Sequence, residues 1–501
     1  MNSAYGITAV TLVAVATLGI GAFGLRFSRT TSDFYVASRS VGPLWNGSAI
    51  GGEYLSAASF LGVAGLVLAF GADMLWFPVG WTAGYLLLLV FVAAPLRRSG
   101  AYTIPDFTEV RLKSAAVRRV ASLLVVVIGW LYLMPQFQGA GLTLRTVTGA
   151  PTWVGSLLVA VIVVANVVSG GMRSITFVQA FQYWLKLTAL LVPLAFLVHA
   201  WLGDGAPTPS ERGRGAGWIE PLTGQDGIAL YATYSLIIAT FLGTMGLPHV
   251  VVRFYTNPDG RAARRTTLLV LGLLGVFYVM PAIYGALGRV YASDLVTKGS
   301  TDTVVLELPG RMLGGGTADL LGALLTAGAF AAFLSTSSGL TMSLAGVIGQ
   351  DVLGRRLSGV AAFRVAAVVS SIVPLGLALS ADRIAVASSV GFAFAVAAST
   401  FCPLLVLGIW WRGLTAAGAI AGLVFGGAAS GGAVAATIVM GSGDGWWSTL
   451  LALPAAWTVP LSFGLMIAVS LLTKADAPSN VARTMVRLHT PERVGVERSD
   501  R

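Results

Sequence analysis

The chain has 501 residues, of which 56% are hydrophobic and only 11% are charged, and its mean hydropathy is +0.81. A water-soluble domain cannot bury that much apolar surface, so the composition excludes a soluble enzyme and predicts a protein solvated by lipid. The formal net charge of +11 comes from short basic clusters between apolar runs, which argues against a face that binds nucleic acid. Cys402 is the one cysteine, so no intrachain disulfide can form.

Apolar runs long enough to cross a bilayer fill most of the chain. About 20 apolar residues span the hydrocarbon core as a helix. This window predicts an all-α polytopic membrane protein with roughly thirteen transmembrane helices. In chain order, the predicted spans cover residues 4–25, 44–70, 74–96, 120–146, 152–170, 177–200, 228–250, 267–290, 318–347, 360–380, 384–410, 414–440 and 446–472.

The basic residues predict the orientation. Arg26 and Arg29 follow the first run and nothing basic precedes it, so we expect a retained helix and not a cleaved signal. With the N-terminus outside, the alternate connections that face the cytoplasm hold most of the lysines and arginines, as the positive-inside rule requires. An odd number of spans then places the tail after Lys474 inside. We therefore predict an N-out, C-in protein of the cell (inner) membrane.

Three places interrupt the apolar pattern, and such interruptions at membrane depth often mark function. The second span reads GSAIGGEYLS around Glu53, the seventh reads TFLGTMGLP before His249, and the ninth has four hydroxyl side chains at 335–338. Glycine and serine also serve as packing residues in transmembrane helices. However, the second and seventh spans lie five apart, as expected if two inverted repeats each open with a broken helix.

This spacing divides the chain into five parts. The predicted parts are an extra N-terminal helix (1–30), a first core repeat (34–200), a second core repeat (227–411), two extra C-terminal helices (412–473) and a cytoplasmic tail (474–501).

Four segments, in this order and at these spacings, resemble the signatures of the sodium:solute symporter family. They are YVASRSVGPLWNGSAIGGEYLSAASFLGVAGLVLAFG, VVSGGMRSITFVQAFQ, GLPHVVVRF and FAAFLSTSSGLTMSLAGVIGQDV. The resemblance covers roughly Phe34 to Trp411, and GEYLSAASFLG and GLPHVVVRFYT are most similar to the cation/acetate symporters. It implies a LeuT-type core of ten helices with alternating access, and uptake of a small monocarboxylate such as acetate together with sodium.

The resemblance also implies where the coupling ion binds. The family's sodium site uses carbonyls of the first core helix, and a carbonyl and two hydroxyls of the eighth. Carried over, these ligands are Gly52, Leu55, Ala332, Ser335 and Thr336. Sodium would be a transported ion, and no other cofactor is expected. Gln179 stands where many members have an aspartate, which puts a gating or second-ion role of that acid in doubt.

Polar residues near the breaks are candidates for binding the solute. Lys186 could attract a carboxylate, or it could snorkel or pair within the bundle. Glu53 could shuttle a proton or steady the unwound turn. His249 and Arg253 are expected at the cytoplasmic end, as a gate or a loop anchor. The six predicted substrate residues are Glu53, Tyr54, Gln136, Lys186, Thr240 and Thr244.

Other functions remain as alternatives. A membrane enzyme would need paired carboxylates or a histidine-rich metal set at depth, which three scattered histidines do not supply. A sensory role is not expected, because the tail is too short for a kinase. The main alternative is a symporter of the same family for proline, a sugar or another solute. The expected partners are the solute, sodium and lipid, and the oligomeric state stays open.

Overall fold

The computed structural model describes residues 3–24, 36–209, 218–220, 227–354, 356–357, 359–380, 386–441, 443 and 445–492. Within these residues the regular elements are all helical, which confirms the predicted fold class. The predicted basic residues Arg26 and Arg29 lie outside the described residues.

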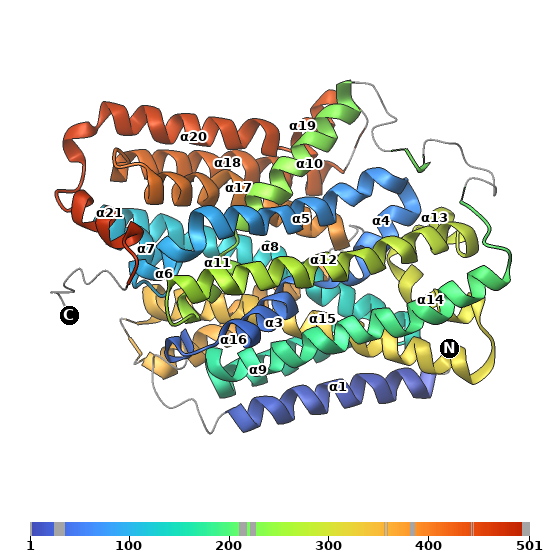
Figure 1. The fold of residues 1–501 in the computed structure, drawn as a ribbon. Coiled ribbons are helices and arrows are strands. Elements are labelled where there is room, and N and C mark those ends of the chain that lie inside the picture. Colours follow the sequence, from blue (N-terminus) through green and yellow to red (C-terminus); the bar gives the residue numbers. More distant parts are fainter. Residues whose placement is uncertain are drawn as a thin grey trace.

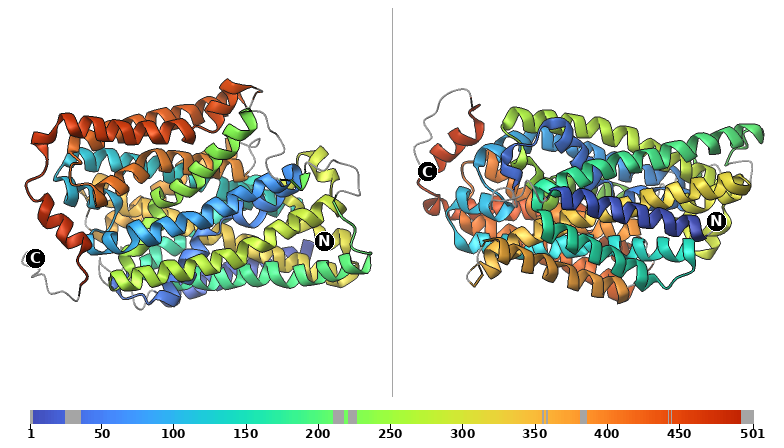
Figure 2. Two further views of the ribbon diagram at one scale, coloured as in Figure 1. Left: turned by 45° about the horizontal axis from the view of Figure 1, so that its top comes forward. Right: turned by 90° about the horizontal axis from the view of Figure 1, so that it is seen from below.

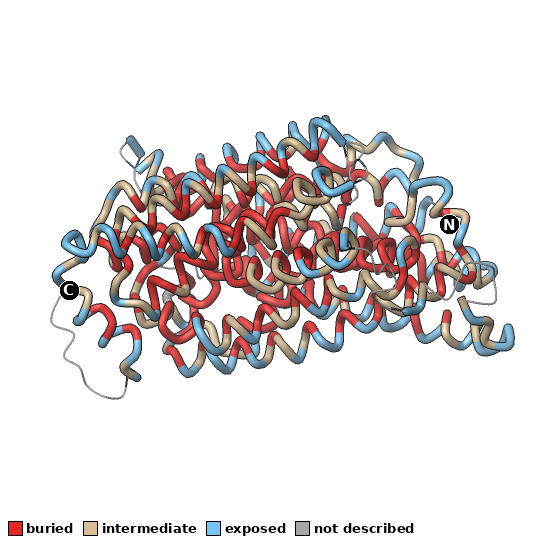
Figure 3. Tube along the Cα trace, turned by 90° about the horizontal axis from the view of Figure 1, so that it is seen from above, coloured by how far each residue is buried: buried red, intermediate tan, exposed pale blue. Residues whose placement is uncertain are grey.

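Eleven helical stretches in the described part are long and apolar enough to cross a membrane. They run along one long axis, and the two chain ends lie at opposite ends of it (Figure 1). Buried residues concentrate inside the bundle, whereas the outer helix faces are exposed (Figure 3). Those outer faces carry large apolar side chains such as Leu12, Leu123, Val276 and Ile372. A surface of this kind is suited to lipid.

Two of the eleven stretches each contain more than one predicted span. The 52-residue helix α9 (Thr152–Gly203) would be about 78 Å long if straight, far more than a bilayer core. Gly171, with φ 59° and ψ −163°, separates it into two helices. Gly71, with φ 82°, similarly interrupts the stretch Ala58–Ser99. These two glycines account for the difference between eleven long stretches and about thirteen predicted spans.

The two predicted helix breaks are present. Helix α3 (Pro43–Tyr54) ends before Leu55, whose ψ of 85° is not helical, and a π-helical turn follows at Ala58–Gly62. Helix α10 (Gly227–Gly246) ends before Leu247, which is extended, and α11 (Pro248–Val252) begins at the predicted proline. Their spacing agrees with the division into repeats 34–200 and 227–411, which stays a prediction.

The break in α3 lies against two long helices. Helix α15 (Gly315–Val347) packs on α9, and both contact α3. A Cβ atom at Gly52 would overlap the backbone carbonyl of Gln179 on α9, so a glycine is needed where α3 approaches α9 this closely. Helix α1 (Ser3–Gly24) covers α9 and α15 from outside (Figure 2).

Other helices enclose the opposite side of the break or form the periphery. Helix α10 packs between α5 and α17, while α18 and α20 pack on each other at one edge (Figures 1 and 2). The remaining helices are α4 (Val63–Phe70), α5 (Trp76–Leu87), α6 (Ala93–Ser99), α7 (Ile104–Leu112), α8 (Ala115–Thr148), α12 (Gly260–Tyr291), α13 (Asp294–Lys298), α14 (Val304–Met312), α16 (Gly359–Ser380), α17 (Val386–Trp410), α18 (Ala416–Met440), α19 (Trp446–Ala452), α20 (Ala455–Leu472) and α21 (Val481–His489).

The first prediction concerns orientation. Because α1 starts at one end of the bundle and α21 lies at the other, a tag before α1 and a tag after Lys474 should lie on opposite sides of the membrane. The positive-inside rule places the N-terminal tag outside. Accessibility of each tag to an impermeant label in intact cells and in inverted vesicles measures this. Both tags on one side would contradict an odd number of spans.

Candidate cation and substrate site

The break in α3 meets a lysine ammonium. Lys186 on α9 is fully buried, and its Nζ donates hydrogen bonds to the carbonyl of Gly52, to the carbonyl of Leu55 at 2.7 Å and to Ser335 Oγ at 3.0 Å. Helix α3 stops at Tyr54, so the Gly51 carbonyl accepts from the Leu55 amide, whereas the carbonyls of Gly52 and Leu55 are free to accept from Lys186. These three acceptors belong to the set that the sequence predicts for sodium.

The other two predicted sodium ligands are hydrogen-bonded to one of these acceptors or to a chain neighbour of one. Ser335 Oγ donates to the Ala332 carbonyl at 3.0 Å, within α15. Thr336 Oγ1 donates to the Glu53 carbonyl at 2.6 Å, which ties α15 to the last turn of α3. Hydrogen bonds therefore link the five predicted ligands into one cluster, in which Lys186 Nζ contacts Gly52, Leu55 and Ser335 directly. We call these five residues and Lys186 the cation cage.

A buried ion pair flanks the cation cage. Arg253, immediately after α11, donates from Nε to Glu53 Oε2 at 2.6 Å, and both side chains are at most 2% exposed. The guanidinium also donates to Thr176 Oγ1 at 3.0 Å and to Gln179 Oε1. Gln179 Nε2 in turn donates to the Ser335 carbonyl at 2.7 Å. A carboxylate in place of Gln179 could accept from Arg253 but could not donate to Ser335.

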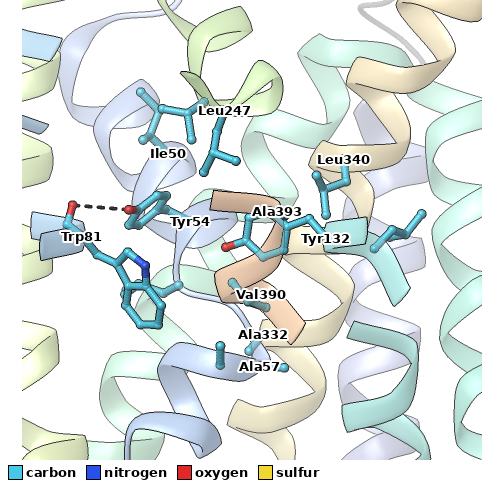
Figure 4. Packing of buried hydrophobic residues seen from close by; sticks show 14 of the residues in the cluster. Ile50, Tyr54, Ala57, Trp81, Tyr132, Leu247, Ala332, Leu340, Val390 and Ala393 are labelled. Carbon is cyan, nitrogen blue, oxygen red and sulfur yellow. Dashed lines mark hydrogen bonds between the residues drawn. The ribbon is translucent and has the colours of Figure 1, made fainter. Parts of the chain in front are cut away.

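Aromatic rings close the other side of the α3 break. Tyr54 packs edge-on against Tyr85 at 4.9 Å between centroids. Phe394 of α17 contacts Tyr54, Trp81 and Tyr132 at 6.3, 5.7 and 5.8 Å. Figure 4 shows Tyr54, Trp81 and Tyr132 in one packed group, with Leu247 of the second break beside them. We call Tyr54, Trp81, Tyr85, Tyr132, His249 and Phe394 the aromatic cage.

The aromatic cage contains hydrogen-bonding groups that the protein does not use. Among the described residues, the Trp81 indole nitrogen, the Tyr85 hydroxyl and both ring nitrogens of His249 have no hydrogen-bond partner, although all three side chains are buried. The His249 ring lies edge-on to Tyr132 at 5.0 Å. Buried polar groups without partners are costly, so such a group is expected to meet a ligand.

The six predicted substrate residues separate into two groups. Tyr54 and Thr244 are together, with their hydroxyl oxygens 2.7 Å apart. Thr240 and Thr244 both lie against glycines of α5, but the Thr240 hydroxyl bonds within its own helix to the Leu236 carbonyl at 2.8 Å, and no contact with Tyr54 is found for it among the described residues.

The remaining three have protein partners. Gln136 Oε1 accepts from the Ala57 backbone amide at 3.0 Å, where the broken helix restarts. Glu53 pairs with Arg253, and Lys186 uses its three donors in the cation cage.

Several residues of the site could not be identified from the sequence. Arg253 and His249, which the sequence places at the cytoplasmic end as a gate or a loop anchor, are both buried, and Arg253 pairs with Glu53 at the α3 break. The signal for His249 was present in Pro248, because a helix that restarts there carries its first residues into the core. Nothing in the local pattern distinguishes Trp81 and Tyr85 from ordinary aromatic packing residues of a membrane helix.

Comparison with known proteins finds a matching family and a sequence relative. The family model of the sodium:solute symporter family matches residues 34–426. An uncharacterized symporter of Bacillus subtilis (strain 168), YwcA, is 34% identical over 425 residues, which is 82% of each chain.

Solved structures show the same fold at low sequence identity. A Na+-coupled sialic acid symporter in a substrate-bound outward-open state is 14% identical and superposes with a TM-score of 0.66, covering 94% of this chain and 98% of that one. MhsT in complex with L-phenylalanine is 16% identical with a TM-score of 0.56, covering 85% and 98%. This likeness confirms the LeuT-type fold.

The second prediction compares hydroxyls of one helix. Ser335→Ala should lower the free energy of unfolding by about 1.5–3 kcal/mol, because it removes the acceptor of one Lys186 donor inside the protein. Thr336→Ala should also destabilise, since it removes the bond to the Glu53 carbonyl. Ser338→Ala is the matched control. Its hydroxyl is buried and unpaired among the described residues, so removing it should be neutral or slightly stabilising.

Thermal unfolding of the three purified variants in one detergent measures this difference. Equal unfolding midpoints for Ser335→Ala and Ser338→Ala would show that the contact between Ser335 and Lys186 contributes nothing to the fold.

Proposed function

Because the chain belongs to the sodium:solute symporter family, we propose that it takes up a small monocarboxylate such as acetate, coupled to the inward movement of a cation. The solute binds in the aromatic cage, and the cation cage contains the positively charged Lys186 ammonium. Both lie at the break in α3, so a change in one is transmitted to the other through the same unwound turn. Such broken helices are the usual site of substrate and ion binding in inverted-repeat transporters.

The unused donors of the aromatic cage support an acidic substrate. The Trp81 indole is a donor only, whereas the Tyr85 hydroxyl and a neutral His249 ring each bring one donor and one acceptor, so the unpaired donors outnumber the unpaired acceptors. A carboxylate offers only acceptors, so it matches this set of groups. Proline would bring a charged amine that needs acceptors, and a sugar would bring as many donors as acceptors. The donor surplus is the observation that carries the proposal.

The buried charges support the same conclusion. With both basic side chains protonated, Lys186 and Arg253 contribute two positive charges next to the α3 break, and the Glu53 carboxylate contributes one negative charge. An excess of one positive charge inside a membrane protein is expensive unless an anion balances it. A small carboxylate would supply that negative charge while the site is closed to water.

The third prediction is the substrate profile. Proteoliposomes containing the chain should accumulate labelled acetate or pyruvate, and not proline or glucose, under an inward gradient of a coupling cation. Sodium and proton gradients are imposed separately, and vesicles without a gradient provide the baseline. Accumulation of proline or glucose in preference to both acids would overturn the monocarboxylate proposal and favour the family alternative.

The fourth prediction tests the donor surplus directly. Tyr85→Phe keeps the ring and removes a hydroxyl that the protein does not use, so the unfolding midpoint should stay unchanged or rise. If this hydroxyl binds the carboxylate, the loss of a hydrogen bond to a charged group costs about 1.5–3 kcal/mol, and the half-saturating acetate concentration should rise roughly 10- to 150-fold.

Tyr284→Phe provides the matched control for this prediction. The Tyr284 hydroxyl is also buried, but it donates to the Leu190 carbonyl at 3.1 Å. This variant should therefore lose stability and keep its acetate affinity. An unchanged half-saturating concentration in Tyr85→Phe would exclude Tyr85 from the substrate site.

A further inference from the structure

The cation cage is already filled by a side chain of the protein. We propose that the Lys186 ammonium is the resident cation of this site, and that it takes the place which the family pattern assigns to sodium. The chain then does not bind sodium between α3 and α15 while Lys186 is in the cage. This inference deepens the proposed function, on which it rests for the identity of the site.

The number and direction of the hydrogen bonds show that the site accommodates an ammonium. A lysine ammonium has three donors and no acceptor. Lys186 Nζ has three acceptors in contact: the Gly52 carbonyl, the Leu55 carbonyl and Ser335 Oγ. Ser335 directs its own proton to the Ala332 carbonyl, so a lone pair of its oxygen faces Lys186. All three donors are therefore matched.

Sodium and Lys186 cannot occupy the cation cage together. A bare sodium ion would have to contact the same three oxygens that the ammonium contacts now. Two positive charges at that separation, buried away from water, repel each other strongly. The oxygens are neutral carbonyls and hydroxyls, so no additional negative charge in the cage offsets this repulsion.

The surroundings also favour the tethered cation over one from solution. The acidic group that faces Lys186 is Glu53, and Oε2 of its carboxylate is already engaged by Arg253. Helix α1 has no charged residue between Ser3 and Gly24, and α15 has none between Leu320 and Val347. The neighbouring helices α8 and α12 place the uncharged side chains of Tyr132, Gln136 and Tyr278 near the α3 break. Lys186 is part of the chain, so its contacts with the broken helix do not depend on the concentration of a dissolved ion. They stabilise the break at any sodium concentration.

The experiment measures sodium binding without any solute. The unfolding midpoint of the purified wild-type chain should be equal in sodium chloride and in choline chloride of the same concentration. Lys186→Ala removes the ammonium from the cation cage and leaves room for sodium. The unfolding midpoint of this variant should therefore rise with the logarithm of the sodium concentration, as expected for a ligand that binds the folded state. Adding Ser335→Ala to Lys186→Ala should abolish the gain.

Two further variants control the comparison. Lys298→Ala removes an exposed lysine that pairs with Asp294 at 2.8 Å, and it should behave as the wild type does. Lys186→Gln, which keeps polar contacts but no charge, replaces Lys186→Ala if the smaller side chain prevents folding. The wild-type measurement is decisive even without a folded variant at position 186.

Two results would overturn the inference. One is a sodium-specific rise in the wild-type midpoint that Ser335→Ala abolishes. The other is a folded Lys186→Ala protein with no response to sodium. Neither depends on the substrate, so a failure of acetate uptake would reject the proposed function and leave this measurement intact.

Discussion

The hydrogen bonds of one ammonium hold the centre of this molecule together. Lys186 donates to two carbonyls that the break in α3 exposes and to one hydroxyl of α15, so three helices meet at a single nitrogen. In a bilayer, freed backbone carbonyls must find donors within the protein. The broken helix is stable in the apolar interior because Lys186 donates hydrogen bonds to the carbonyls of Gly52 and Leu55. Gly52 has no side chain, so α9 can approach α3 closely enough for Lys186 to reach these carbonyls.

The rest of the site follows from that positive charge. Glu53 and Arg253 form a pair beside it, and Gln179 links that pair to the backbone of α15. Removing one partner of such a pair leaves an uncompensated buried charge, which is strongly destabilising. The aromatic cage on the opposite side of the break has unpaired donors on Trp81, Tyr85 and His249, so a solute anion there would accept hydrogen bonds from them and balance the charge.

The sequence predicts the fold class and the breaks. The resemblance to the family names the oxygens of the cation cage as sodium ligands, which stays a prediction, and neither indicates that Lys186 donates to three of them. Glycine, proline and hydroxyl residues interrupt apolar runs locally, so the breaks near Glu53 and Pro248 are visible in a linear pattern. Lys186, in contrast, lies far along the chain from Gly52 and Ser335. Its position depends on how closely α9 packs on α3, which no local pattern specifies. Arg253 could not be assigned to the site for the same reason. It directly follows α11, and only the packing of α11 on α3 brings its side chain to Glu53.

An experimental map of the cation cage in sodium-rich buffer tests the central claim most directly. The resolution must separate a lysine nitrogen from a free ion. The account predicts density for the Lys186 side chain that reaches the carbonyls of Gly52 and Leu55 and the hydroxyl of Ser335. An isolated peak among those oxygens, with the Lys186 side chain withdrawn from them, would contradict it.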